Sequence, residues 1–73
     1  MEEMKASMAG TVLNVLANQN DQVAKGQEVI ILESMKMEIP VECECDGMIQ
    51  EIKVSIGDFV NEGDTLFTVA PNS

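Results

Sequence analysis

The sequence predicts an all-β fold built from two similar halves, and three observations lead to this prediction. Apolar and polar residues alternate along the centre of the chain, as in a strand with one dry face. No segment repeats its apolar residues with the period of a helix. Glycines and other turn residues recur at an offset of 37 residues, which indicates one supersecondary unit used twice.

The first half contains the signals for three strands. We expect a short strand at 4–8, followed by Gly10 and a second strand over the β-branched, apolar run 11–16. The polar stretch 18–22 predicts a turn in which Asn20 takes a left-handed conformation, and Gly26 suits another turn. A third strand is expected at 27–33, where consecutive apolar residues indicate cover on both faces.

The clearest alternation follows residue 37. One face carries polar residues and Pro40, whereas the other carries Ile39, Val41, Cys43 and Cys45. Because proline lacks an N–H, Pro40 indicates a strand at the edge of a sheet.

The second half repeats the pattern of the first. It predicts a strand at 47–54, turns at Gly57-Asp58 and Gly63-Asp64, a closing strand at 65–69 and a tail at 71–73. Four positions are identical across the offset: Gly10 and Gly47, Asp21 and Asp58, Val23 and Val60, Gly26 and Gly63. Two such units would bury both dry faces in one flattened barrel or sandwich. Since 36 plus 37 is 73, the repeat places the chain ends opposite Lys36.

Length and composition favour one small domain, 1–73, that is soluble and monomeric. The chain has 73 residues, 45% of them hydrophobic, and a formal net charge of −9. This charge opposes binding to nucleic acid or to anionic membranes, and no apolar run is long enough for a membrane span. The amino terminus lacks the pattern of a signal peptide, and a Met at position 1 favours a free-standing subunit.

The two cysteines indicate a reducing cytoplasm. Cys43 and Cys45 share one face of a strand, where they would bridge poorly, and are expected to serve as small apolar residues. Without a histidine or a second cysteine pair, we expect no metal site.

A tight hairpin with Lys36 at its tip is predicted at the centre of the chain, in the stretch Glu33-Ser34-Met35-Lys36-Met37-Glu38. A two-residue hairpin normally uses Asn-Gly or Asp-Gly, because both central residues need a positive φ. Met-Lys forgoes that advantage, and local strain of this kind often marks a functional site.

This stretch resembles the biotin-acceptor motif of the biotinyl/lipoyl attachment family, whose usual core is Ala-Met-Lys-Met. Met35, Lys36 and Met37 match it, and Ser34 stands where alanine is usual. The glycine-bearing halves extend the resemblance over nearly the whole chain. It implies two quasi-twofold-related, four-stranded antiparallel sheets (a barrel-sandwich hybrid) with the acceptor lysine on a β-hairpin.

The resemblance implies a carrier rather than an enzyme. A biotin protein ligase would attach biotin covalently to Lys36, which would then carry carboxybiotin between a biotin carboxylase and a carboxyltransferase. Met35 and Met37 would be flanking recognition residues, although packing within the hairpin would also explain them. Glu33 and Ser34 would help select the ligase, although Glu33 also suits a solvated strand end.

Three alternatives remain. The first is that lipoate, alone or beside biotin, is attached to the same lysine. Met35 and Met37 oppose this hypothesis, because lipoyl tips in the family are typically Asp-Lys-Ala. Glu33-Ser34 favours it, because lipoyl tips often begin with these residues. A plain interaction module is a remote alternative. An enzyme is opposed by the lack of a convergent nucleophile, base and oxyanion site. Because 17–27 is too short for an inserted thumb, the chain looks like the thumbless carriers of the family.

Overall fold

The computed structural model describes residues 2–71, and all of its regular structure is β-strand. The strands are β1 (Glu2–Lys5), β2 (Gly10–Val15), β3 (Gln22–Val23), β4 (Glu28–Ser34), β5 (Met37–Glu42), β6 (Gly47–Ile52), β7 (Phe59–Val60) and β8 (Thr65–Pro71). Within this range there is no helix of the length and apolarity that a membrane span would need. The all-β prediction is confirmed.

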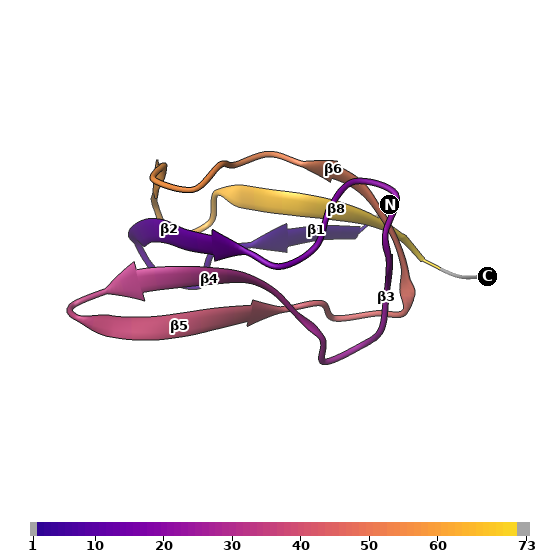
Figure 1. Cartoon of the computed structure of the whole chain (residues 1–73), viewed down its shortest axis with the longest axis horizontal. Coiled ribbons are helices and arrows are strands. Elements are labelled where there is room, and N and C mark those ends of the chain that lie inside the picture. Colours follow the sequence, from indigo (N-terminus) through magenta and orange to yellow (C-terminus); the bar gives the residue numbers. More distant parts are fainter. Residues whose placement is uncertain (1, 72–73) are drawn as a thin grey trace.

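The strands form two four-stranded antiparallel sheets. We call β5-β4-β2-β7 the hairpin sheet and β1-β8-β6-β3 the terminal sheet. The sheets face each other in an elongated sandwich with extents of 37 × 17 × 17 Å (Figure 1). The β4–β5 hairpin lies at one end of the long axis, and the chain enters β1 and leaves β8 at the other end.

The predicted repeat is confirmed in the backbone. An offset of 37 residues carries β2, β3 and β4 onto β6, β7 and β8, and so exchanges the two sheets. The Asn20 N–H donates to the Ile49 carbonyl and the Gly57 N–H donates to the Val12 carbonyl, both at 2.8 Å. Asn20 has a φ of 74° and Gly57 a φ of 95°, so this turn position keeps the left-handed conformation although its residue differs between the halves.

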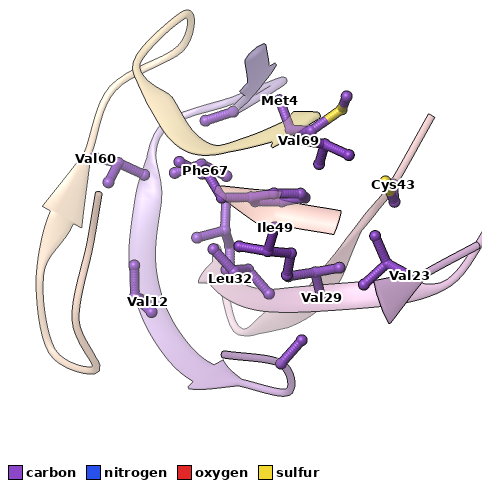
Figure 2. Packing of buried hydrophobic residues seen from close by; sticks show 14 residues of the cluster. Met4, Val12, Val23, Val29, Leu32, Cys43, Ile49, Val60, Phe67 and Val69 are labelled. Carbon is purple, nitrogen blue, oxygen red and sulfur yellow. The ribbon is translucent and has the colours of Figure 1, made fainter. Parts of the chain in front are cut away.

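The core lies between the sheets and is almost entirely aliphatic. Side chains from both sheets contribute to it, including Val12 and Leu32 from the hairpin sheet and Ile49 and Val69 from the terminal sheet (Figure 2). Phe67 is fully buried, whereas the other aromatic residue, Phe59, is 66% exposed. The predicted alternation after residue 37 is confirmed: Ile39 and Val41 pack against the core, and Pro40 is exposed on the edge strand β5.

Two predicted boundaries were wrong at the ends of the chain. The first strand is Glu2–Lys5 rather than 4–8, because Ala6 leaves the ladder to bond with the turn at 61–64. Its N–H donates to the Asp64 carbonyl, and its carbonyl accepts from the Gly63 N–H. Pro71, expected in a tail, ends β8 opposite Gly47, and the rest of that tail lies outside the described residues.

Candidate functional site

Lys36 sits in the connection of a two-residue β-hairpin. β4 and β5 pair in register from Ile30 and Val41 up to Ser34 and Met37, which leaves only Met35 and Lys36 outside the ladder. Six pairs of residues hold the two strands together. The tip is therefore fixed to the sandwich through its own strands rather than through a mobile loop.

The backbone of this turn carries the strain predicted from the sequence. Met35 has a φ of 53° and Lys36 a φ of 66°. Both values lie in the left-handed region, which matches the right-handed twist of the strands but costs a side-chain-bearing residue roughly 1 kcal/mol. Asn-Gly would adopt this turn at a lower cost in free energy than Met-Lys does. The presence of Met35 and Lys36 therefore indicates that the site requires their side chains.

The side chains of the turn project into solvent. Met35 is 85% exposed and Met37 is 64% exposed, and Lys36 is exposed between them. Neither methionine belongs to the hydrophobic core, so packing within the fold does not account for this pair. The hairpin thus presents one amine flanked by two flexible apolar side chains.

Glu33 and Ser34 occupy different environments, although they are neighbours in β4. Glu33 is exposed and lies opposite Glu38 on one side and Thr11 on the other. Ser34 is half-buried and approaches Gly10, since a Cβ built on that glycine would lie 3.4 Å from the Ser34 Cβ.

Two glutamates, Glu33 and Glu38, lie beside the tip and form no ion pair with Lys36. In residues 2–71 the ion pairs are Lys5 with Glu3 and Lys53 with Glu51, so Lys36 has no carboxylate within pairing distance there. Its amine is therefore accessible to the active site of another protein. An amide to a carboxylic acid cofactor fits this position, because it requires an accessible amine and no surrounding pocket.

An open groove of about 760 Å³ lies outside the β4–β5 hairpin. It is lined by residues of 15–19 and 51–56, among them Val15 and its counterpart Ile52. None of its lining residues belongs to the β4–β5 hairpin. The groove is therefore separate from the tip.

Sequence reasoning missed two residues near the hairpin. Gly10 was expected only to open a strand, but it also lets β2 approach the backbone of β4 below the turn. Phe59 received no role from the sequence and lies exposed on the hairpin sheet, opposite Thr11. The repeat held a signal for Phe59, because its counterpart is the polar Gln22.

Comparison with known proteins identifies a family. A family model described as "Biotin-requiring enzyme" matches residues 2–69. A biotin/lipoyl attachment protein of Bacillus subtilis (strain 168) is 52% identical over 63 residues, which cover 86% of each chain. A biotin carboxyl carrier protein of Streptococcus mutans is 46% identical over 67 residues, which cover 92% of this chain and 52% of that protein.

A solved structure gives the same result for the fold. The crystal structure of the Kluyveromyces lactis urea carboxylase superposes with a TM-score of 0.90 at 30% identity. The match covers 94% of this chain but only 6% of that enzyme. The likeness therefore concerns one domain of a much larger protein.

Proposed function

The chain belongs to the biotin/lipoyl attachment family, and we propose on this basis that it is a biotin carboxyl carrier whose Lys36 bears biotin. The observation that carries the proposal is the exposed Met35-Lys36-Met37 turn at one pole of a rigid sandwich. The carrier has no catalytic residues of its own; it is a substrate of a ligase and a component of a carboxylase system.

Attachment needs only presentation from this chain. The ligase supplies an activated biotinyl acyl group, and the neutral Lys36 amine attacks its carbonyl carbon. The amide C–N bond forms, the activating group leaves, and the amine proton passes to a base or to water. A rigid hairpin favours this step, because the ordering entropy of the turn has been spent in folding. Lys5 and Lys53 form ion pairs with neighbouring glutamates. Lys25 lies in an exposed turn, but that turn joins β3 and β4, which belong to different sheets, and is not the tip of a hairpin.

Once attached, biotin supplies a ureido nitrogen that accepts and gives up a carboxyl group. The chain's own contribution is to hold the arm away from its surface and to keep it tethered. Tethering gives an effective concentration of roughly mM at a neighbouring active site, so weak association with each partner is sufficient. Amide formation also removes the positive charge of Lys36, which leaves Glu33 and Glu38 as the charged residues of the stretch 33–38.

We further propose a biotin carboxylase and a carboxyltransferase as the partners that load and unload the arm. The urea carboxylase match supports a carboxylase setting, because there the same fold is one domain of a larger enzyme. Cys43 and Cys45 are free thiols, which supports a cytoplasmic location, and the acidic surface supports a monomer.

Lipoate is the second candidate, because the Bacillus relative carries both cofactors in its name. It would use the same lysine and the same exposed turn. The methionine on each side of Lys36 favours biotin, since the family's lipoyl tips are typically Asp-Lys-Ala.

The test is intact mass spectrometry after incubation with a biotin protein ligase, biotin and ATP. We expect one biotin per chain, lost in Lys36→Arg and retained in the matched control Lys25→Arg. A parallel reaction with a lipoate ligase and lipoate separates the second candidate by its mass increment. A chain that gains neither group under saturating conditions contradicts both carrier functions.

A further inference from the structure

An apolar patch lies on the outer face of the hairpin sheet, away from the core. We define the outer patch as Leu13, Ile31, Pro40 and Phe59. Ile31 pairs directly with Pro40 on one side and with Asn14, beside the bulged Leu13, on the other. Phe59 is 66% and Leu13 is 40% exposed. Directly paired residues share a face, so Ile31 and Pro40 are neighbours on it. Phe59 lies on the same face through its pairing with Thr11, which pairs in turn with Glu33, two residues along β4 from Ile31.

The internal repeat provides a control for this patch. The equivalent positions in the terminal sheet are all polar: Gln50, Thr68, Glu3 and Gln22, of which Thr68 is buried. At two further positions of this face the hairpin sheet carries the polar residue and the terminal sheet the apolar one. These positions are Thr11 and Glu33, whose counterparts are Met48 and Ala70. Because the same backbone folds with polar residues at the four patch positions, the outer patch is not a requirement of the fold. Exposed apolar groups of this kind mark contact with another molecule.

The charges on the same face point to a basic partner. The strands of the hairpin sheet carry four glutamates and no lysine. Glu33 lies directly opposite Glu38, and Glu28 lies opposite Glu42, an arrangement of like charges that destabilises a sheet. On the terminal sheet, by contrast, Glu3 and Glu51 are paired with lysines at 3.9 and 3.0 Å. The glutamates of the hairpin sheet have no lysine in their own sheet, so a partner protein with lysine or arginine on its surface would complement them.

We infer that this face docks the enzyme that acylates Lys36, through a surface with an apolar centre and a rim of lysine or arginine. The inference rests on the proposed function. The row formed by Phe59, Thr11 and Glu33 is one residue from the Ser34–Met37 pair that closes the hairpin. An enzyme acting on the unmodified amine reaches only the length of a lysine side chain, so it must approach the hairpin and the adjoining face. An enzyme acting on the far end of the attached cofactor is held further away by the longer arm.

The test compares three glutamine variants, each of which copies the equivalent residue of the other half. Phe59→Gln and Leu13→Gln remove the outer patch. Ile56→Gln is the matched control, because Ile56 is 64% exposed, belongs to no strand of the hairpin sheet and has Gln19 as its counterpart. Initial rates of biotin attachment by a biotin protein ligase are measured against carrier concentration, and thermal melting confirms that each variant is folded.

We expect KM for the carrier to rise at least about fivefold in Phe59→Gln and in Leu13→Gln, with kcat little changed and Ile56→Gln like the wild type. Added salt should raise the wild-type KM, and less so in Glu38→Gln. Wild-type kinetics in both patch variants, or equal losses in all three, would overturn the docking surface while leaving Lys36 as the acceptor. Normal attachment with slowed carboxylation would instead assign the patch to a carboxylase, against our inference. A wild-type chain that is never biotinylated removes the proposed function and this inference with it.

Discussion

A Cβ atom on Gly10 would lie 2.7 Å from the carbonyl oxygen of Glu33. Only a residue without a side chain lets β2 run this close to the strand that leads into the Lys36 turn. The same relationship recurs in the other half, where a Cβ on Gly47 would collide with the Ala70 carbonyl. These paired contacts explain why both glycines survive in the repeat, although neither has a positive φ.

Gly10→Ala should therefore disturb the end of β4 and with it the acceptor turn. We expect a loss of about 1–3 kcal/mol in the free energy of unfolding, typical of an overpacked site, and slower biotin attachment to the folded protein. Denaturant unfolding and attachment kinetics measure the two effects. Gly47→Ala is the control, since it creates an equivalent clash at the opposite pole and should lose stability without slowing attachment. Equal attachment rates in the two variants would show that Gly10 does not position the hairpin.

The strained turn predicts an opposition between stability and function. Met35→Asn should raise the free energy of unfolding by about 1 kcal/mol, because asparagine tolerates the left-handed conformation better. It should also slow biotin attachment, since an exposed apolar contact beside Lys36 is lost. Asn20→Gly, at a φ of 74° far from the tip, should keep normal attachment. A Met35→Asn variant that is no more stable than the wild type would contradict the cost assigned to the turn.

Thr68 offers a test of the internal comparison. Its hydroxyl is buried without a hydrogen-bond partner, whereas its counterpart in β4 is Ile31. An unsatisfied buried hydroxyl costs free energy that an apolar group of similar shape does not. Thr68→Val should stabilise the protein by about 1 kcal/mol, measured by denaturant unfolding, and should leave attachment unchanged. Destabilisation would mean that the hydroxyl has a partner in solution.

We expect Cys45 to make the free energy of unfolding depend on pH in the alkaline range. Burial, reinforced by the neighbouring Cys43, raises the pKa of the Cys45 thiol above its ordinary value of 9.0. The folded protein therefore keeps a proton that the unfolded chain releases, and stability should fall as the pH rises through and beyond 9.0. Unfolding measured between neutral and alkaline pH should show a shallower decline in Cys45→Ala than in the wild type. Parallel declines would exclude this thiol as a cause.

Most of the fold follows from local patterns that the tertiary structure leaves intact. The alternation after residue 37 reports one wet and one dry face because β5 lies at an edge, with Pro40 turned outward. The repeat predicted the positions of the turns, since Asn20 and Gly57 both adopt the positive φ that the turn needs. The acceptor turn was also predictable, because Met35 and Lys36 lie between two strand-like runs, 29–32 and 39–41.

What the sequence did not reveal depends on contacts between distant segments. The end of the first strand is set by hydrogen bonds that Ala6 donates to Asp64 and accepts from Gly63, which local propensity does not encode. The close approach of Gly10 to Glu33 and the exposure of Phe59 both require the sheet order to be known. Residues of the outer patch are scattered over four strands and acquire a common surface only after folding.

The quasi-twofold axis makes the two poles of the sandwich interchangeable in principle. The Lys36 turn joins β4 to β5 at one pole, and β8 ends beside the start of β1 at the other, with Val69 paired to Glu2. A circular permutant that linked those two strands by a second Met-Lys turn would carry an acceptor at each end of one small body. Such a permutant would present one acceptor lysine at each pole and could serve two active sites at once. The present sequence places an acceptor turn at the β4–β5 pole.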